Sequence, residues 1–267
     1  MNWPDDYLIP GIKPFHQEEA GIIYCGDCRE ILPSFYNLDM VITSPPYNVN
    51  KNYGDKVNDD LPYEDYLDFL NNVWNQCLIS MRDGARIAIN VGDLGRNPYY
   101  PVHADVMSRM RKNFYLMGLI IWNKRNCLSN TAWGSWQSPS APSLRGMHEF
   151  IIIAGKGGKE FRKEIRPDTW GKKEFLEATL EIWNLTPETY NYKHPALFPV
   201  QLPRRLIKLY SYPGDIVLDP FLGSGTTAVA AKELGRKFIG IEIEEKYCEI
   251  AVKRLRQGVL DFGEIKQ

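Results

Sequence analysis

The sequence predicts an α/β fold in which a mainly parallel sheet is covered by helices on both faces. Short apolar runs alternate with segments of helical periodicity along most of the chain. One run leads into a glycine-rich turn that opens a helix, which is typical of a strand–turn–helix unit. The 267 residues, 44% hydrophobic and 24% charged, suit a soluble globular enzyme and suffice for one large core. We therefore expect a single domain over residues 1–267.

Each expected element follows from its pattern. The segment after Pro62 carries apolar residues at helical spacing, Pro62 occupies a first-turn position, and Gly84 is expected to close that helix. The expected helices cover 29–35 (a helical turn), 62–84, 102–111, about three turns ending near 212, 226–234 and 245–256. The expected strands, each a short apolar run, are 21–24, 40–42, 85–91, 114–122, 149–154, 215–219 and 237–241.

Two segments lack periodicity. Residues 126–146 form a long connection, and such connections in compact domains are usually functional. Residues 155–173 hold seven cations against three anions in a chain whose net charge is −1. A solvated charged loop and a phosphate-binding patch both fit this excess of four positive charges.

Several classes are disfavoured by composition. The first ten residues contain acidic side chains and no apolar core, so they are no signal peptide, and the run 115–122 is too short to span a bilayer. We expect a cytoplasmic protein without membrane contact. Cys25 and Cys28 form a lone C-x-x-C without a second ligand pair, so we expect structural cysteines and no metal site.

The first functional motif is residues 43–48, TSPPYN, directly after the expected strand 40–42. Pro45 and Pro46 fix two φ angles and remove two N–H donors, which leaves stiff backbone with unpaired carbonyls. Ser44 adds a hydroxyl and Tyr47 an aromatic face. Such a ledge suits a flipped-out nucleobase, whose amino hydrogens need acceptors and whose ring needs a stacking partner. A simple turn is the alternative for this motif alone.

The second motif is residues 219–228, DPFLGSGTTA. Gly223, Gly225 and Ala228 satisfy G-x-G-x-x-A between an expected strand and an expected helix. Glu242 follows 23 residues after Asp219, at the end of the next strand. This context predicts a Rossmann-like adenosine cofactor whose ribose hydroxyls are bound by Glu242.

The charge of the motif indicates which adenosine cofactor it binds. Asp219 places a carboxylate where a dinucleotide would lay its pyrophosphate. S-adenosylmethionine has no phosphate and carries an ammonium and a sulfonium, which suit Asp219 and the nearby Phe221 ring. A nicotinamide-dependent oxidoreductase is the alternative from another class.

The two motifs together resemble those of the DNA amino-methyltransferases, which methylate cytosine N4 or adenine N6. The likeness covers residues 22–256. TSPPY before DPFLGSG resembles the beta arrangement of that family, a circular permutation of the usual methyltransferase motif order. Residues 194–207 resemble the motif that flanks the cofactor, and residues 26–27 resemble the turn that contacts the adenine.

Chemistry and resemblance together assign roles. Ser44 Oγ and the Pro45 carbonyl are expected to accept the hydrogens of the target amine, while Pro46 keeps the ledge rigid and Tyr47 stacks on the base. The resemblance implies cofactor contacts at Asp27, Cys28, Thr43, His194, Pro195, Phe198, Asp219, Pro220, Phe221, Gly223, Ser224, Gly225, Thr226 and Glu242. DNA contacts are expected from insertions around 126–147 and 155–193, with candidates Arg145, Lys156, Lys159, Arg162 and Lys163.

In this family the first residue of the catalytic motif is Ser mostly in cytosine-N4 enzymes and Asp mostly in adenine-N6 enzymes. Ser44 therefore favours a site-specific methyltransferase that acts on N4 of a flipped-out cytosine in double-stranded DNA. Adenine N6, RNA or a protein side-chain amide are alternative targets, and a DNA-binding module without turnover is a further alternative. We expect a restriction-modification setting with a cognate restriction endonuclease as functional partner, and a monomer or homodimer.

Overall fold

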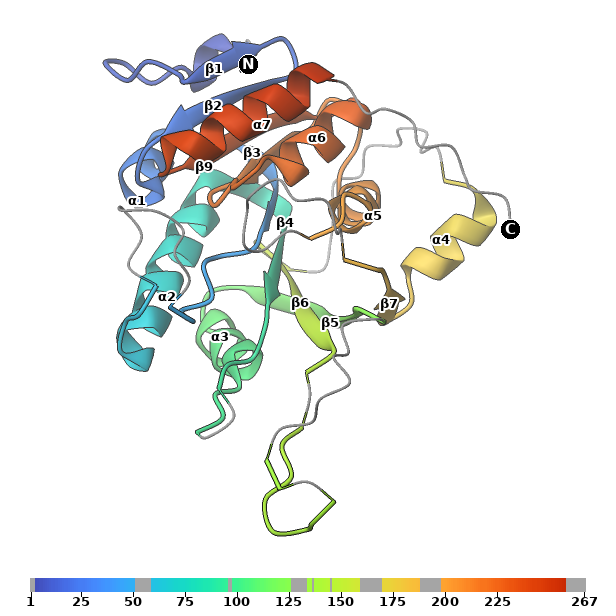
Figure 1. Cartoon of the computed structure of the whole chain (residues 1–267). Helices are drawn as coiled ribbons and strands as arrows, with labels where there is room; N and C mark the ends of the chain where they lie inside the picture. Colours follow the sequence, from blue (N-terminus) through green and yellow to red (C-terminus); the bar gives the residue numbers. More distant parts are fainter. Residues whose placement is uncertain are drawn as a thin grey trace.

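The computed structural model describes residues 3–50, 59–95, 98–125, 134–135, 137–144, 146–158, 170–187 and 198–257. Within these ranges the strands form one nine-stranded sheet in the order β1-β2-β9-β8-β3-β4-β6-β5-β7 (Figure 1). The order is far from the chain order. Strands from the beginning and the end of the chain therefore lie side by side in the centre.

The central strands run parallel and are almost fully buried: β2 (Gly21–Cys25), β9 (Lys237–Glu242), β8 (Ile216–Asp219), β3 (Leu38–Thr43) and β4 (Met81–Val91). Runs of this kind are hydrophobic throughout because helices cover both of their faces. Parallel strands place their carboxyl ends at one edge of the sheet. This edge, at which β3, β8 and β9 end, is called the carboxyl edge below.

The remaining strands extend the sheet at its sides. β6 (His148–Gly155) runs antiparallel to β4 and to β5 (Tyr115–Asn123), and its pairing of Phe150 with Val91 brings its first residues to the carboxyl edge. The outer strands are β1 (His16–Glu18), antiparallel to β2, and β7 (Ile182–Asn184), parallel to β5.

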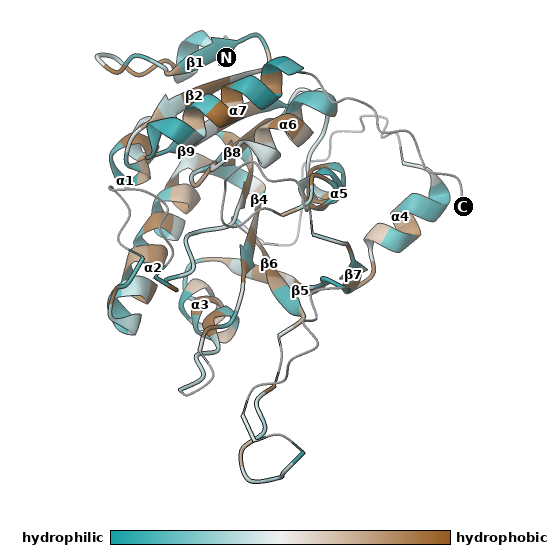
Figure 2. Cartoon of the chain, viewed as in Figure 1, coloured by the Kyte–Doolittle hydropathy of each residue, from teal (hydrophilic) through white to brown (hydrophobic). Residues whose placement is uncertain are grey.

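Helices cover the sheet in two groups. α1 (Cys28–Ile31), α2 (Tyr63–Ser80) and α3 (Val102–Met110) contribute to the hydrophobic core on one face, together with η1 (Asp5–Tyr7) and η2 (Leu32–Ser34). α5 (Gln201–Tyr210), α6 (Thr226–Glu233) and α7 (Glu245–Gln257) form the core on the other face. α4 (Lys172–Ala178) precedes β7. Figure 2 shows brown hydrophobic residues along the central strands and both colours on α7, as expected for an amphipathic helix.

The mainly parallel α/β architecture expected from the sequence is confirmed. The expected function of Gly84 is wrong: α2 ends at Ser80, and Gly84 lies within β4 with a φ of 78°. There the β3–β4 pairing shifts register between Leu38 and Met40, and an irregularity of this kind suits a glycine in the left-handed region. The expected turn 29–35 divides into α1 and η2, whereas β1, β7 and α4 were not predicted.

The two expected insertions are described in part. Residues 137–144, between β5 and β6, lie well away from the sheet (Figure 1), and Leu144 there is 91% exposed. Residues 170–187 supply α4 and the edge strand β7, which Trp183 anchors in the core. No helix among the described residues is both long and apolar enough to cross a membrane.

Candidate active site

The two motifs meet at the carboxyl edge because β3 and β8 are neighbours. Thr43, at the end of β3, donates its hydroxyl to Asp219 Oδ1 at 2.8 Å. Thr227 of α6 donates to Asp219 Oδ2 at 2.6 Å, and the Phe221 N–H donates to Oδ1 at 3.1 Å. Asp219 is 2% exposed, and burial raises its pKa to about 6 although these three hydrogen bonds act in the opposite direction. The Thr43 hydroxyl thus links β3, which leads into the predicted catalytic motif, to β8, which leads into the predicted cofactor motif.

The glycine-rich loop adopts backbone conformations that favour glycine. Gly223 and Gly225 have φ angles of 53° and 85°, and Gly225 is the N-cap of α6. A Cβ on Gly225 would lie 2.7 Å from Ala251 Cβ of α7. The loop is therefore packed directly against α7, and the Gly225 position has no room for a side chain.

Two predicted cofactor contacts have side chains that face the protein interior. The Arg254 guanidinium donates to Ser224 Oγ, to Thr226 Oγ1 and to the Ser224 carbonyl, each at 2.9 Å. Ser224 and Thr226 are both buried. Both hydroxyls are thus engaged by Arg254 and stabilise the loop. A cofactor contact of Ser224 or Thr226 would therefore use backbone atoms. Arg254 was not predicted.

Glu242 lies beside the glycine loop at the end of β9. Its carboxylate accepts from the Gly223 N–H at 2.8 Å and from the Glu244 N–H at 2.9 Å, and burial raises its pKa to about 7. The Glu242 carbonyl accepts from the Gly26 N–H at 2.9 Å. The predicted ribose-binding carboxylate and the predicted adenine-binding turn, residues 26–27, are therefore neighbours.

The two residues after Gly26 begin α1. Asp27 caps the helix by accepting from the Arg29 N–H at 2.9 Å, and its ion pair with the Arg29 guanidinium lowers its pKa. Cys28 is buried, and burial raises the pKa of its thiol to about 12, as expected for a packing residue.

The side chains at this edge fit a cofactor with hydroxyls and positive charge. Asp219 and Glu242 bring two carboxylates to adjacent strand ends, a setting that disfavours phosphate. Phe221 is partly buried, with its ring 5.9 Å from Phe69 and 6.2 Å from Trp74 between centroids. Of the other predicted contacts, Pro220 is buried and Phe198 packs against the core beneath α5 and α6.

The SPPY ledge (residues 44–47) is fixed from several sides. The Pro46 carbonyl accepts from Tyr66 Oη at 2.8 Å, whereas no described residue donates to the Pro45 carbonyl. The Asn48 side chain forms a reciprocal pair with the Leu61 backbone, at 2.8 and 2.7 Å. The Pro45 carbonyl thus receives no hydrogen bond from the described residues, and it can accept one from a substrate amine, as the sequence predicts.

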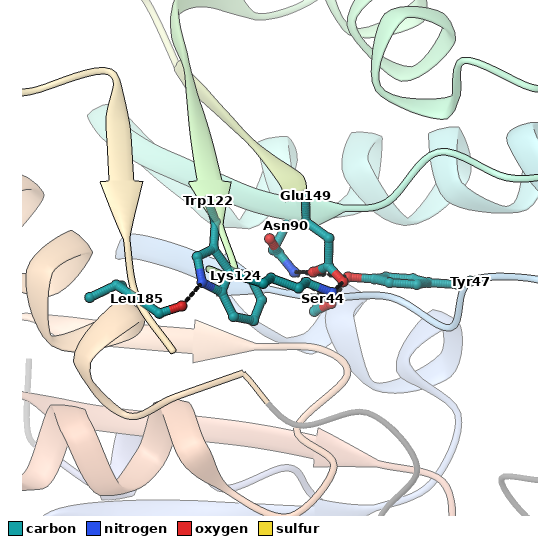
Figure 3. A network of polar contacts seen from close by, with 7 residues as sticks. All are labelled: Ser44, Tyr47, Asn90, Trp122, Lys124, Glu149 and Leu185. Carbon is teal, nitrogen blue, oxygen red and sulfur yellow. Dashed lines mark hydrogen bonds and ion pairs between the residues drawn. The ribbon is translucent and has the colours of Figure 1, made fainter. Parts of the chain in front are cut away.

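A polar network surrounds Ser44 and Tyr47 (Figure 3). Ser44 Oγ is 3.0 Å from Tyr47 Oη, which is 2.8 Å from Glu149 Oε2. Asn90 Nδ2 donates to Glu149 Oε2 at 2.6 Å and to Tyr47 Oη at 2.8 Å. The Lys124 ammonium forms an ion pair with the other Glu149 oxygen. Burial and the Glu149 carboxylate raise the pKa of Tyr47 well above its ordinary value, so its hydroxyl carries a proton.

Sequence reasoning did not find Asn90, Lys124 or Glu149. Asn90 lies near the end of β4, and Glu149 enters the same edge at the start of the antiparallel strand β6. The available signal was a charged residue directly before the apolar run 150–154. It points to this edge only once β6 is known to be antiparallel.

The remaining predicted residues divide into two groups. Outside the described residues lie His194, Pro195, Arg145, Lys159, Arg162 and Lys163. Lys156 is described and lies after the end of β6, at the opposite edge of the sheet, where its ammonium donates to the Met81 carbonyl at 2.6 Å. This placement does not support a contact between Lys156 and DNA held at the SPPY ledge.

Fold and site together define a class of enzyme. A Rossmann-like sheet brings an acidic, glycine-rich loop, predicted to bind an adenosine cofactor, to the SPPY ledge, and the Thr43–Asp219 hydrogen bond joins the two. This combination defines an S-adenosylmethionine-dependent methyltransferase that acts on an amine.

Comparison with known proteins identifies the family. A DNA methylase family model, N6_N4_Mtase, matches residues 38–253. The Type II methyltransferase M.SmaI of Serratia marcescens is 28% identical over 87% of this chain and 90% of its own length. The Type II methyltransferase M2.LlaDCHI of Lactococcus lactis subsp. cremoris is 28% identical over 95% of this chain and 97% of its own.

Solved structures agree with this assignment. A putative DNA modification methylase of Thermus thermophilus, TTHA0409, in complex with S-adenosyl-L-methionine, has a TM-score of 0.70 at 31% identity, over 90% of this chain and 95% of that one. The cytosine-N4-specific PvuII DNA methyltransferase shares the fold, with a TM-score of 0.70 at 21% identity over 91% and 88% of the two chains. The chain belongs to the N6/N4 DNA methylase family, whose members use S-adenosylmethionine to methylate DNA.

Proposed function

We propose that this protein is a site-specific DNA methyltransferase that transfers the methyl group of S-adenosylmethionine to N4 of a flipped-out cytosine in duplex DNA. The observation that carries the proposal is the serine at the first position of the ledge. Ser44 is the residue that cytosine-N4 enzymes of this family mostly have there, and Pro45, whose carbonyl accepts from no described residue, follows it directly in the sequence.

The ledge accounts for the activation of the amine. The lone pair of an exocyclic amine is delocalised into the base and is a poor nucleophile. Two acceptors, Ser44 Oγ and the Pro45 carbonyl, draw the amine hydrogens out of the ring plane and bear the developing positive charge. Because the prolines and the Tyr66–Pro46 hydrogen bond hold the ledge rigid, these acceptors need little reorganisation. No covalent protein intermediate is required.

Different residues at the cofactor side would bind different parts of S-adenosylmethionine. Glu242 is the ribose acceptor, Phe221 offers an aromatic face, and Asp219 supplies negative charge behind the glycine loop. The chemistry that S-adenosylmethionine supplies when bound is an electrophilic methyl group. Backbone groups of residues 26–27 would receive the adenine, since the Asp27 carboxylate is engaged by Arg29.

DNA binding is assigned to the two insertions around 126–147 and 155–193. Both flank the strands that carry the network around Tyr47, and residues 137–144 extend outward from the sheet. Extrusion of a base costs a few kcal/mol, which stacking on Tyr47 and phosphate contacts would offset. The biological setting that fits is cytoplasmic restriction-modification, with an endonuclease that recognises the same site and with the enzyme acting as a monomer or homodimer.

Identification of the methylated nucleoside tests the proposal. Unmethylated plasmid DNA is incubated with the purified protein and S-adenosylmethionine, digested to nucleosides and analysed by mass spectrometry against synthetic standards. The expected product is N4-methyldeoxycytidine, and Tyr47→Ala should yield little of it. N6-methyldeoxyadenosine would show that the assigned base is wrong within the same family, and absence of any methylated nucleoside would contradict the proposed substrate.

A further inference from the structure

The Ser44 hydroxyl can serve the reaction in only one orientation. A hydroxyl has one proton and two lone pairs, and the distance to its neighbour does not reveal which group donates. If the Ser44 proton faced the base, it would oppose the amine hydrogens instead of accepting them. Something in the site must therefore direct this proton away from the substrate.

The hydrogen-bond chain behind Ser44 ends at Glu149. Ser44 Oγ lies 3.0 Å from Tyr47 Oη, and Tyr47 Oη lies 2.8 Å from Glu149 Oε2. Glu149 is 8% exposed and forms an ion pair with Lys124, whose ammonium also lies 5.0 Å from the centre of the Trp122 ring (Figure 3). A carboxylate held in this way accepts hydrogen bonds and donates none.

The donor and acceptor of each hydrogen bond in the series Ser44–Tyr47–Glu149 follow from the last group, the Glu149 carboxylate. Since Glu149 only accepts, the single Tyr47 proton is donated to Glu149. The lone pairs of the phenolic oxygen then face its other neighbours, Asn90 Nδ2 at 2.8 Å and Ser44 Oγ at 3.0 Å. The Asn90 nitrogen is a donor at this position because it also contacts the carboxylate at 2.6 Å. Ser44 therefore donates its proton inward to Tyr47. Asn90 Nδ2, at 3.4 Å, donates a longer hydrogen bond to one lone pair of Ser44 Oγ, and the other lone pair remains for the substrate amine.

We propose that Glu149 is a positioning residue for methyl transfer: through Tyr47 it fixes the orientation of the Ser44 hydroxyl, so that Ser44 presents a lone pair to the target amine. The inference rests on the role of Ser44 in the proposed function, and it holds equally for cytosine and adenine amines. It also gives Tyr47 a second task besides stacking. The ion pair with Lys124 then contributes to catalysis as well as to stability, because it keeps Glu149 in the carboxylate form that accepts the Tyr47 proton.

The variant Glu149→Gln tests which groups donate in the hydrogen bonds that link Ser44, Tyr47 and Glu149. Beside the Lys124 ammonium, the new amide turns its oxygen to the lysine and its NH₂ group to Tyr47. Tyr47 then donates to Ser44, whose proton is forced toward the substrate. We expect kcat to fall about 10²- to 10³-fold, the scale of one lost transition-state hydrogen bond, while the S-adenosylmethionine affinity measured by calorimetry stays unchanged.

A double variant separates this role from a merely structural one. In Lys124→Met/Glu149→Gln the amide is free to turn its oxygen toward Tyr47 and Asn90, which restores the original direction. We expect its kcat to lie well above that of Glu149→Gln alone. If the double variant is no more active than Glu149→Gln, the inference is overturned, because loss of a structural ion pair predicts no rescue.

The controls make each outcome decisive. Glu233→Gln removes a carboxylate that is likewise shielded and ion-paired, with Arg204, far from the ledge, and it should keep the wild-type kcat. Transfer of tritiated methyl groups into unmethylated DNA by the wild-type enzyme tests the proposed function itself. Wild-type transfer together with an unchanged kcat in Glu149→Gln would overturn only the inference. Should Glu149→Gln not fold, Tyr47→Phe breaks the same chain, and a wild-type kcat in that variant would overturn it as well.

Discussion

Gly225 offers a quantitative test of how tightly the cofactor loop is built. Its φ of 85° lies in the left-handed region, and a Cβ there would come within 2.7 Å of Ala251 Cβ. Gly235 is a matched control, since its φ is 69° but a Cβ would have no heavy atom within 4 Å. Both Gly→Ala changes carry the conformational cost, and only that at Gly225 adds a steric cost.

The magnitudes follow from these two terms. The left-handed conformation costs an alanine about 1–2 kcal/mol, and insertion of a methyl group into a packed contact adds about 1–3 kcal/mol. Gly225→Ala should therefore lower the free energy of unfolding in urea by about 2–5 kcal/mol and weaken S-adenosylmethionine binding, because the loop and α7 must separate. Gly235→Ala should lose only about 1–2 kcal/mol and bind normally. Equal losses in the two variants, or tight binding by Gly225→Ala, would refute this reasoning.

Three further predictions concern the carboxylates and the ledge. Burial raises the pKa of Glu242 to about 7, and the carboxylate is the better acceptor for ribose hydroxyls, so S-adenosylmethionine affinity should weaken toward acid, approaching tenfold per pH unit below this pKa. Calorimetry between about pH 6 and pH 8 checks this against Glu242→Gln, which should show no such slope. In the free protein the sign is opposite: the stabilising contribution of Glu242 is complete below about pH 4.5 and is lost as the pH rises through about 7, which urea unfolding at both extremes measures. Tyr47→Ala should lower turnover roughly 5- to 150-fold through lost stacking with cofactor affinity retained, whereas Asp219→Asn should weaken cofactor binding on the order of tenfold; parallel losses of both functions in both folded variants would contradict this division.

The parts of the site that could be predicted are those whose chemistry is local. Two prolines after a buried strand specify a rigid ledge wherever that strand lies, and Gly223 and Gly225 specify a turn whatever packs beneath it. The acidic residues that end β8 and β9, Asp219 and Glu242, could also be placed together from the sequence, because parallel strands end at one edge of the sheet. These features require no knowledge of which strands are neighbours.

The parts that could not be predicted depend on long-range pairing. Glu149 reaches Tyr47 only because β6 inserts antiparallel between β4 and β5, and periodicity does not encode strand direction. Arg254 reaches Ser224 across 30 positions of sequence through the packing of α7 on the loop. Gly84 shows the same limit. A glycine after a helical pattern can end the helix or occupy an irregularity in the next strand, and only the pairing with β3 distinguishes the two.

A pair of threonines can separate the stability of the site from the coupling between its halves. Thr43 and Thr227 are each 1% exposed, and each donates one hydrogen bond to a different oxygen of Asp219. Thr→Val at either position removes a hydrogen bond to a buried carboxylate and should cost about 1.5–3 kcal/mol of unfolding free energy. Of the two threonines, only Thr43 lies on β3, the strand that leads into the SPPY ledge, whereas Thr227 lies on α6 after the glycine loop. Thr43→Val should therefore lower kcat with nearly wild-type cofactor affinity, whereas Thr227→Val should mainly weaken the affinity. Steady-state and binding measurements on both variants check this, and identical kinetic effects would mean that the Thr43–Asp219 hydrogen bond contributes to stability alone.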